Sequence, residues 1–491
     1  MVRRTKRLAD LMRTLDVDPQ IEWADVIIGG VCEDSRRVAP GELFVAIRGA
    51  AQDGADFAAS AAARGAAAVI CDRSLPLPVP CLVVSDTRRA LAVLSARFFD
   101  EPTRALRTVG VTGTNGKTTV CHWIAHLLGR ERTELVSTVE NEARGLRAIT
   151  TPSSPIVQRI ARDAVDAGKE NLVIEASSIG LDQRRLEAVA FDVAAFTNLT
   201  HDHFDLHNTQ EAYAAAKAGL FRMLGPGGWA VVNADDPHAD AMLAASGGES
   251  FRVGLNGPAD LTASDIAQDA DGTNFRLAYD GKTVPVRVPA LGRHNAENAV
   301  VAAGAAICLG RSLQEIAERL RTAPAIPGRG TAFRDKRGTT AIVDFAHNPD
   351  ALLRILETLR TSYDRIITVF GTPGGGERAK RQEMGEISGR LADVTILTSD
   401  NPKDERPESI IDEIALGVRQ AGSEPRIRVD RAEAIRLAAE EAGARDVIVV
   451  AGKGHERYQI VRGEFVPYSD ASVLGGLGFE LILGARGRAE G

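Results

Sequence analysis

Short apolar runs alternate with alanine-rich, helix-like stretches along almost the whole chain. In the first part, the runs 43–47 and 67–70 predict strands, and the stretches 56–63 and 88–99 predict helices. Strands separated by helices are typical of α/β folds with parallel sheets. The polar run 33–37 predicts a surface loop, and 100–103 predicts a linker. We therefore expect a first domain over residues 1–104.

The middle part, residues 105–330, begins with an apolar strand that runs into a glycine-rich loop and then a helix over 120–128. Further strands are predicted at 134–138, 171–174, 191–196, 229–232 and 251–254. From 261 to 289 the pattern changes to alternation interrupted by Asp280-Gly281, which predicts antiparallel hairpins. A helix rich in alanine is expected after 292.

The last part, residues 331–491, has four apolar runs at 341–344, 366–370, 394–397 and 447–450, with helical stretches between them. This alternation predicts a doubly wound sheet. Polar, glycine-containing loops at 371–381, 399–403 and 452–456 follow three of these strands. Because the carboxyl ends of parallel strands meet at one sheet edge, we expect the three loops to lie together there and to form a ligand site.

Composition narrows the class of protein. The 491 residues are 44% hydrophobic and 25% charged, as in globular proteins of about three domains. A net charge of −7 argues against nucleic acid as the main partner. The five cysteines are scattered, which favours buried thiols in a reducing compartment. No stretch predicts a secretory leader or a membrane span, so we expect a cytoplasmic protein without a membrane partner.

The most informative stretch is Gly110-Val-Thr-Gly-Thr-Asn-Gly-Lys-Thr-Thr119, between the first strand and helix of the middle part. Gly113 and Gly116 let backbone N–H groups approach a phosphate, and the helix that follows directs its positive end there. Lys117 adds a charge for the phosphates, and the Thr118 hydroxyl is placed for Mg²⁺. The spacing departs from the strict P-loop form at Val111. The stretch still predicts a nucleotide-binding P-loop.

Other polar residues of the middle part carry weaker signals. Glu175 ends a predicted strand, where a carboxylate could hold Mg²⁺ or cap a helix. The loop 197–207 contains three histidines and two aspartates, which favours metal or phosphate chemistry beside the P-loop. Lys217, on an alanine-rich helix, is by its sequence context a solvated lysine. Asn295 and Asn298 could contact a purine or cap a helix.

Eight motifs together resemble the Mur ligase family of cytoplasmic cell-wall enzymes, over nearly the whole chain. The likeness is greatest to the branch that adds the third amino acid to a UDP-N-acetylmuramoyl-dipeptide. The motifs are Asp34-Ser-Arg36, Gly113-Thr-Asn-Gly-Lys-Thr-Thr119, Thr150-Thr-Pro152, Glu175-Ala-Ser-Ser178, Thr197-Asn-Leu-Thr-His-Asp-His-Phe-Asp205, Pro327-Gly-Arg329, Asp344-Phe-Ala-His347 and Gly452-Lys-Gly-His-Glu456.

The resemblance implies an α/β protein with three domains: a UDP-substrate domain (1–104), a central ATP-binding P-loop domain (105–330) and a closing, doubly wound C-terminal domain (331–491). It implies ATP-dependent, ADP-forming amide synthesis through an acyl phosphate, with ATP and Mg²⁺ as cofactors. The implied ATP contacts are Gly113, Thr114, Asn115, Gly116, Lys117, Thr118, Thr119, Asn295, Arg329 and Asp344.

The same resemblance implies the remaining site residues. Thr118 and Glu175 would hold one Mg²⁺ and His203 would help to hold a second. Lys217 matches a carbamylated lysine, an N-carboxylysine whose anionic group can serve Mg²⁺. The expected catalytic residues are Lys117, Glu175, His203 and Lys217. The implied UDP-substrate contacts are Ser35, Thr150, Thr151, Ser177, Gln183 and Arg185. The implied amino-acid contacts are Arg381, Asp400, Asn401, Lys403, Gly452 and Glu456.

Two departures from the family pattern concern the amino acid. The loop at 371 usually reads Gly-Cys-Gly-Gly-Asp-Arg-Asp, but here Pro373 replaces a glycine and Gly375 and Gly376 replace Asp-Arg. The branch selective for diaminopimelate has Asp-Asn-Pro-Arg, and here the last residue is Lys403. Lysine keeps the charge but loses the two-pronged grip on a carboxylate. We expect meso-diaminopimelate as the added amino acid, with relaxed preference.

Three alternatives stay open: a related ligase of secondary metabolism that couples a different acid and amine, a folylpolyglutamate-type ligase, and a nucleotide-gated binding protein without catalysis. Ser177, Gln183 and Arg185 speak against folate. Intact Lys117, Glu175, His203 and Lys217 speak against a binding protein without catalysis. The expected partners are the UDP-MurNAc-dipeptide and a free amino acid, both as substrates. We expect the protein to be a monomer.

Overall fold

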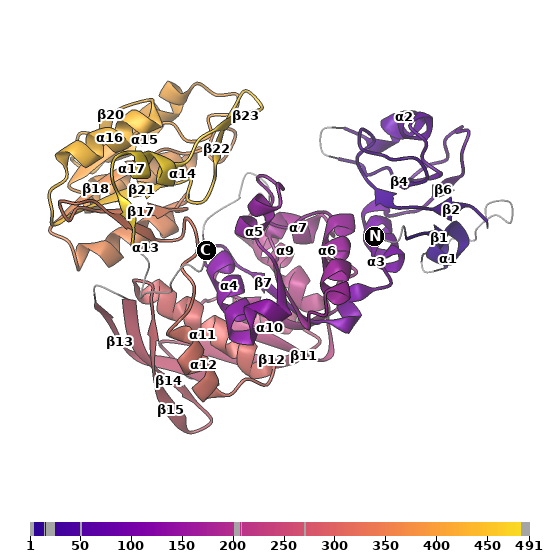
Figure 1. Cartoon of the computed structure of the whole chain (residues 1–491), viewed down its shortest axis with the longest axis horizontal. Coiled ribbons are helices and arrows are strands. Elements are labelled where there is room, and N and C mark those ends of the chain that lie inside the picture. The colour runs from indigo at the N-terminus through magenta and orange to yellow at the C-terminus, as the bar shows by residue number, and fades with distance from the viewer. Residues whose placement is uncertain are drawn as a thin grey trace.

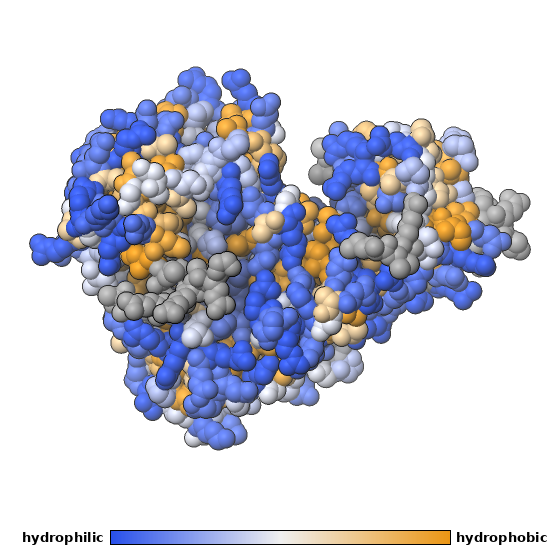
Figure 2. All heavy atoms as spheres, in the orientation of Figure 1, coloured by the Kyte–Doolittle hydropathy of each residue, from blue (hydrophilic) through white to orange (hydrophobic). Residues whose placement is uncertain are grey.

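The computed structural model describes residues 4–13, 15, 25–49, 52–200, 207, 209–269 and 272–482. Figure 1 shows three α/β segments, with the N-terminal and the C-terminal segments both joined to the central one. The visible face is mostly hydrophilic and is deeply notched between the N-terminal and C-terminal segments (Figure 2). In the ranges just given, no helix is long and apolar enough to cross a membrane.

The N-terminal segment is built on a four-stranded parallel sheet of order β3-β4-β5-β6. Apolar side chains of both sheet faces are buried, which accounts for the continuous apolar runs in the sequence. The sheet strands are β3 (Val31–Cys32), β4 (Leu43–Val45), β5 (Ala68–Cys71) and β6 (Cys81–Val83). The other elements are β1 (Lys6–Arg7), β2 (Ile27–Ile28), α1 (Leu8–Met12), η2 (Gly54–Phe57), α2 (Ala58–Ala63), α3 (Thr87–Phe98) and η3 (Pro102–Ala105).

The central segment contains a nine-stranded sheet of order β15-β14-β13-β12-β11-β10-β7-β9-β8. Strands β8 to β12 run parallel, whereas β13, β14 and β15 form the antiparallel hairpins predicted from the sequence. Its strands are β7 (Arg107–Thr112), β8 (Thr133–Val136), β9 (Asn171–Glu175), β10 (Phe191–Phe196), β11 (Leu224–Asn233), β12 (Glu249–Gly254), β13 (Leu261–Asp269), β14 (Gly272–Tyr279) and β15 (Lys282–Val288).

Helices cover both faces of the central sheet. One face packs against α4, α11 and α12, and the other against α6, α7 and α9, so that two separate apolar cores form. Strand β7 lies between β10 and β9, which places the loop after it at the carboxyl edge of the parallel part of the sheet. The helices are α4 (Lys117–Leu128), η4 (Arg130–Arg132), α5 (Thr138–Ala143), α6 (Ser154–Asp166), α7 (Ser178–Asp182), α9 (Gln210–Arg222), α10 (Ala239–Ala244), α11 (Arg293–Cys308) and α12 (Leu313–Leu320).

The C-terminal segment has a seven-stranded sheet of order β20-β19-β18-β21-β17-β16-β24, with helices on both faces. Strands β17 to β21 are parallel, so the three polar loops lie at one edge as predicted. The strands are β16 (Thr331–Arg334), β17 (Thr340–Asp344), β18 (Arg365–Phe370), β19 (Val394–Leu397), β20 (Arg426–Ile427), β21 (Asp446–Ala451) and β24 (Glu480–Leu481), with a separate hairpin of β22 (Tyr458–Val461) and β23 (Glu464–Pro467). The helices are α13 (Pro349–Arg360), α14 (Ala379–Leu391), α15 (Pro407–Gln420), α16 (Arg431–Glu441) and α17 (Asp470–Gly476).

The structure confirms the predicted α/β class, the central P-loop and the doubly wound C-terminal sheet. The limits 1–104, 105–330 and 331–491 stay a prediction. His203 and most of the histidine-rich loop lie outside the described residues.

Candidate functional site

The loop between β7 and α4 has the shape of a phosphate cradle. Gly113 and Gly116 have φ of +146° and +83°, backbone conformations that side chains with a Cβ rarely adopt. A Cβ at Gly113 would also overlap Thr197 Oγ1, and one at Gly116 would overlap Asn298 Oδ1. Helix α4 begins at Lys117, directly after the loop. Glycine at both positions therefore lets the loop close against its neighbours at the positive end of the helix.

The side chain of Lys117 folds back over this loop. Its Nζ donates to the carbonyl oxygens of Gly113 at 3.1 Å and Thr114 at 2.9 Å. These carbonyls fix the ammonium at the mouth of the cradle, where a nucleotide phosphate would approach. The position agrees with the sequence prediction of a phosphate-neutralising charge.

Glu175 and Thr118 meet beside the cradle. Glu175 is only 2% exposed, and Thr118 Oγ1 lies 3.1 Å from both of its carboxylate oxygens. Thr138 donates to Glu175 Oε2 from its backbone N at 2.9 Å and from its hydroxyl at 3.1 Å. The buried carboxylate is therefore stabilised by three hydrogen-bond donors from two elements.

This donor set fits Mg²⁺. A carboxylate and a hydroxyl are the hard oxygen ligands that the ion prefers, and Mg²⁺ in phosphate sites usually takes one or two carboxylates with phosphate oxygens and waters. Within the described ranges, no three His, Cys, Asp or Glu side chains come together as a further metal cluster. The predicted contribution of His203 lies outside those ranges.

Lys217 is buried, so the prediction of a solvated lysine was wrong. The residue is 1% exposed, and its Nζ donates to the Gly113 carbonyl at 2.7 Å and lies 4.1 Å from the centre of the Tyr213 ring. Helix α9 packs its apolar face against the sheet, and Lys217 falls on the side that faces the P-loop. The alanine-rich sequence around it gave no sign of this, because the contacts come from a loop about 100 residues earlier.

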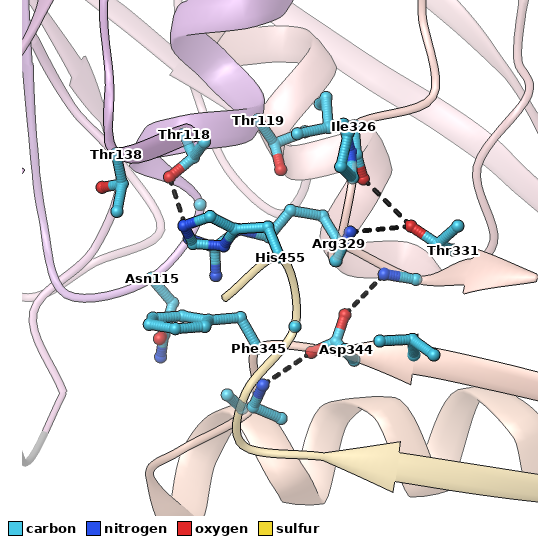
Figure 3. Close-up of a pocket in the computed structure, with 18 of the residues that line it drawn as sticks. Asn115, Thr118, Thr119, Thr138, Ile326, Arg329, Thr331, Asp344, Phe345 and His455 are labelled. Atoms are coloured by element: carbon cyan, nitrogen blue, oxygen red, sulfur yellow. Dashed lines mark hydrogen bonds between the residues drawn. The ribbon is translucent and has the colours of Figure 1, made fainter. Parts of the chain in front are cut away.

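Residues at the junction of the central and C-terminal segments complete the nucleotide end of the site (Figure 3). Arg329 Nη2 donates to Thr118 Oγ1 at 3.1 Å, and its guanidinium lies 4.3 Å from the centre of the Phe345 ring. Burial lowers the pKa of Arg329, an effect that Glu175 and Asp344 oppose. Burial also raises the pKa of Asp344, although Arg329 and two backbone N–H groups favour its charged form. The guanidinium thus joins the two segments beside the P-loop.

A single cavity of about 1510 Å³ connects these groups. It lies between the central and C-terminal segments, and many of the residues predicted for ATP and for the UDP substrate line it. Those residues are Thr114, Asn115, Gly116, Lys117, Thr118, Thr119, Thr150, Thr151, Glu175, Ser177, Arg185, Lys217, Asn295, Arg329 and Asp344.

The residues predicted to hold the UDP substrate form a hydrogen-bonded ridge on one side of the cavity. Thr151 Oγ1 donates to the Glu175 carbonyl at 2.7 Å and accepts from the Ser177 backbone N at 2.9 Å. Arg185 donates to the Thr151 carbonyl at 2.6 Å and, from Nη2, to Gln183 Oε1 at 2.7 Å. This ridge links the substrate side directly to the Glu175 strand. Ser35, on the N-terminal segment, does not line the cavity.

The residues predicted for the amino acid gather in the C-terminal segment. Lys453 is fully buried and donates to Asn401 Oδ1 at 2.9 Å and to Glu456 Oε2 at 2.8 Å. Asn401 Nδ2 donates to the same Glu456 oxygen at 2.9 Å. Burial and Asp400 raise the pKa of Glu456, while Lys453 opposes the shift. Lys453 was missed as a site residue, although the Gly452-Lys-Gly motif singled out its loop.

Arg381 and Lys403, also predicted for the amino acid, differ in burial and in their contacts. Arg381 is 1% exposed and forms ion pairs with Glu405 at 2.9 Å and Glu413 at 3.0 Å. Lys403 is half-buried, and its side chain passes over Gly375, where a Cβ would lie 3.7 Å from Lys403 Cδ. Neither residue lines the cavity, whereas Gly454 and His455, from the loop that carries Lys453 and Glu456, do. The Arg381 guanidinium, which was expected to contact the amino-acid substrate, is thus already paired with the carboxylates of Glu405 and Glu413.

The P-loop, the buried carboxylate and the cavity shared by two α/β segments define a nucleotide-dependent enzyme that acts between its domains. Family models match the chain in three places: the Mur ligase family catalytic domain at 27–99, the Mur ligase middle domain at 111–306 and the Mur ligase glutamate ligase domain at 328–454. The chain belongs to the Mur ligase family.

Curated relatives agree over nearly the whole length. The chain is 40% identical over 453 residues to the UDP-N-acetylmuramoyl-L-alanyl-D-glutamate--2,6-diaminopimelate ligase of Geobacillus kaustophilus, covering 90% of this chain and 92% of that protein. It is 41% identical over 475 residues to the ligase of the same name from Chlorobaculum tepidum, covering 92% and 93%.

Solved structures give the same result. A structure of a UDP-N-acetylmuramoyl-L-alanyl-D-glutamate--2,6-diaminopimelate ligase superposes with a TM-score of 0.68 at 33% identity, over 96% of this chain and 98% of that one. MurF from Acinetobacter baumannii, at 21% identity and a TM-score of 0.68 over 96% and 98% of the two chains, shares the fold.

Proposed function

We propose that the protein joins a free amino acid to UDP-N-acetylmuramoyl-L-alanyl-D-glutamate in peptidoglycan synthesis, with ATP converted to ADP and phosphate. We propose meso-diaminopimelate as that amino acid. The observation that carries the proposal is the single cavity in which the P-loop, Glu175 and the Thr151 ridge meet Arg329, just before the first strand of the C-terminal segment.

The nucleotide end would work by charge neutralisation. A substrate carboxylate and a γ-phosphate repel each other, so the transfer needs positive charge at the phosphate. Lys117, held by two loop carbonyls, and Arg329, held at Thr118, would supply it from opposite sides of the cradle. Mg²⁺ held by Thr118 and Glu175, with His203 and a carbamylated Lys217 as further ligands, would add charge stabilisation of the phosphates when bound.

The reaction would then proceed in two balanced steps. The carboxylate oxygen attacks the γ-phosphorus and ADP leaves, which forms an acyl phosphate. The amine nitrogen of the amino acid then attacks the acyl carbon, phosphate leaves and the nitrogen loses a proton. Because water would hydrolyse the acyl phosphate, the amino-acid cluster around Lys453 and Glu456 must approach while the cavity is closed.

The amino-acid cluster supports a substrate that has both a carboxylate and an amine on its side chain. Glu456 would hold the distal amine, Lys403 the distal carboxylate, and Arg381 the α-carboxylate, with Asp400, Asn401 and Gly452 around them. Arg381 would reach a substrate only as part of its network with Glu405 and Glu413.

A phosphate-release assay with the UDP-MurNAc-dipeptide and a panel of amino acids tests the proposal. We expect release that depends on ATP, Mg²⁺, the dipeptide and an amino acid together, with the greatest kcat/KM for meso-diaminopimelate. Release without any amino acid, or none with any member of the panel, would contradict it.

One observation supports a second candidate function, a ligase of the same type that serves a specialised pathway and couples a different acid or amine. Lys403 stands where the family pattern has an arginine, and Gly375 and Gly376 stand where it has Asp-Arg. The side chain of Lys403 lies over Gly375, so the two departures meet at one place. The same assay decides, because this enzyme would use the diaminopimelate and muramoyl substrates poorly and another pair well. We further propose that the protein acts in the cytoplasm as a monomer.

A further inference from the structure

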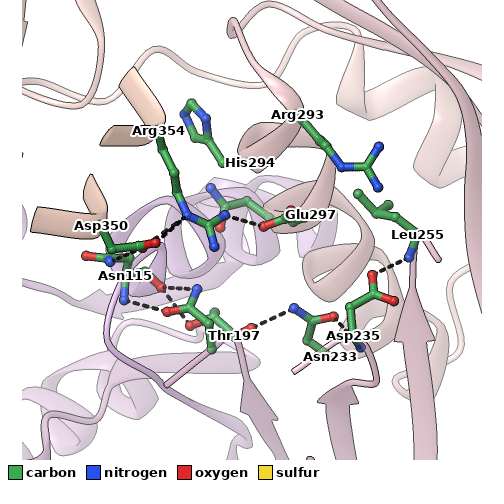
Figure 4. Close-up of polar contacts among 12 residues, drawn as sticks. Asn115, Thr197, Asn233, Asp235, Leu255, Arg293, His294, Glu297, Asp350 and Arg354 are labelled. Atoms are coloured by element: carbon green, nitrogen blue, oxygen red, sulfur yellow. Dashed lines mark hydrogen bonds and ion pairs between the residues drawn. The ribbon is translucent and has the colours of Figure 1, made fainter. Parts of the chain in front are cut away.

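The side chain of Asn115, in the middle of the P-loop, is held by the C-terminal segment. Its Nδ2 donates to Asp350 Oδ2 at 2.8 Å (Figure 4). Its Oδ1 accepts from Asn348 Nδ2 at 3.1 Å. Both partners belong to the first turn of α13, which Asn348 caps by accepting from the Ala351 backbone N at 2.9 Å. The nitrogen and the oxygen of the Asn115 side-chain amide are thus both bound by residues more than 230 positions later in the sequence.

The backbone of Asn115 is fixed at the same time by the central segment. Its N–H donates to Asn198 Oδ1 at 2.9 Å, and its carbonyl accepts from Thr197 Oγ1 at 2.7 Å. The residue therefore links the loop after β10 to α13 through the P-loop. A shift of the P-loop backbone must move the amide that Asp350 and Asn348 hold.

Asp350 is itself held by an ion pair that reaches a third element. Arg354 Nε lies 3.1 and 3.0 Å from the two Asp350 oxygens, and Arg354 Nη1 donates to Glu297 Oε2 at 2.7 Å. Glu297 is part of α11, whose next residue, Asn298, lies so close to Gly116 that a Cβ there would overlap it. The P-loop, α11 and α13 thus form one closed circuit of polar contacts.

We propose that Asp350, acting through Asn115, is a positioning residue that seats the C-terminal segment on the nucleotide loop. The proposal builds on the proposed ATP site, and Asp350 would act through Asn115, because Asn115 lines the cavity and Asp350 does not. Its role is to hold the segment that carries Asp344 and the amino-acid cluster in the arrangement in which the cavity is shared.

Kinetics separate positioning from nucleotide binding. In Asp350→Ala we expect kcat to fall about tenfold or more, in line with the loss of a hydrogen bond to a charged group, while the ADP dissociation constant stays within about twofold. Asp350→Asn keeps an acceptor for Asn115 but loses the charge that Arg354 requires, so we expect a smaller loss. Glu357→Gln, an exposed carboxylate on the same helix, is the matched control and should behave as wild type.

A double-mutant cycle tests whether Asp350 acts through Asn115. If it does, Asn115→Ala combined with Asp350→Ala should be no slower than the worse single variant. Losses in kcat that simply multiply would overturn the proposal, as would wild-type kcat in Asp350→Ala.

Small-angle scattering gives a readout that needs no turnover. With ADP bound, we expect a larger radius of gyration for Asp350→Ala than for wild type or Glu357→Gln, because the C-terminal segment would no longer be held on the P-loop. An unchanged radius would overturn the proposal. Circular dichroism checks that each variant is folded, and Asp350→Asn takes the place of any variant that is not. If the wild-type protein shows no ligase activity, the proposed function fails. The radius of gyration still tests whether Asp350 holds the C-terminal segment on the P-loop.

Discussion

Lys217 Nζ donates to the carbonyl oxygen of Gly113 at 2.7 Å, and both residues are shielded from solvent. The same Nζ lies 4.1 Å from the centre of the Tyr213 ring, so the side chain is enclosed between helix α9 and the P-loop. Carbamylation would replace this cation with an anion beside the P-loop. The burial therefore fits a functional lysine and excludes the solvated one.

Lys217→Ala should reduce turnover by at least about 100-fold, if the carboxylated lysine supports the phosphate chemistry. Added acetate should restore part of the activity, because a small carboxylate can enter the space left by the side chain. The control is Lys282→Ala, an exposed lysine on β15. Full activity in a folded Lys217→Ala protein would exclude the predicted role.

Lys117→Ala should lower kcat by about 100-fold or more with the fold unchanged, because the ammonium acts on charge that develops during phosphoryl transfer. Phosphate release under saturating substrates measures the effect, and circular dichroism checks the fold. A folded variant with wild-type turnover would show that the loop does not serve ATP chemistry.

Lys403→Arg should raise the preference for meso-diaminopimelate over L-lysine. Arginine can place two parallel hydrogen bonds on the distal carboxylate, where lysine places one charge. We expect a change in the ratio of kcat/KM values of about tenfold, the scale of one hydrogen bond to a charged group. Lys336→Arg, at an exposed position, is the control. If wild type prefers L-lysine and the ratio does not move, Lys403 does not read the substrate.

The Glu405 carboxylate predicts a pH-dependent contribution to stability. Hydrogen bonds from Arg381 and from the Gly375 backbone N lower the pKa of Glu405 from 4.5 to about 2. Because the native-state pKa is depressed, the stabilisation is fully present above about pH 4.5 and is lost as the pH falls towards 2.

Glu405→Gln should therefore lower the apparent melting temperature at pH 7, and the gap to wild type should narrow as the pH falls through that window. Thermal unfolding at several pH values measures it, with Glu408→Gln, whose carboxylate is exposed, as the control. A gap that stays constant from pH 7 to pH 2.5 would contradict the assignment.

Asp470→Ala should destabilise the C-terminal segment by about 3–5 kcal/mol, because it leaves a buried cation without its partner. Arg431 donates to Asp470 from Nε at 2.8 Å and from Nη2 at 2.9 Å, and both side chains are fully buried. The exposed pair of Arg419 and Glu424 is the control, and Glu424→Ala should cost far less, because water screens an exposed ion pair. Urea unfolding compares the two, and equal losses would refute the distinction.

Local pattern determined much of the architecture. The strand, glycine loop and helix around Lys117 were predictable because adjacent residues set backbone geometry and helix start. Asp280-Gly281 identified the antiparallel hairpins for the same reason. The family assignment and the type of reaction followed from motifs spread over the chain, and the comparisons confirm both. The predicted roles of individual site residues stay predictions.

The tertiary structure alone decided which side chains meet. Sequence could not show that Lys217 is buried, that Lys453 organises the amino-acid loops, or that Arg381 is already paired with two carboxylates. It could not pair Asn115 with Asp350 across 235 positions. Local propensity carries no information on such contacts, because burial and ion pairing depend on which distant elements pack together.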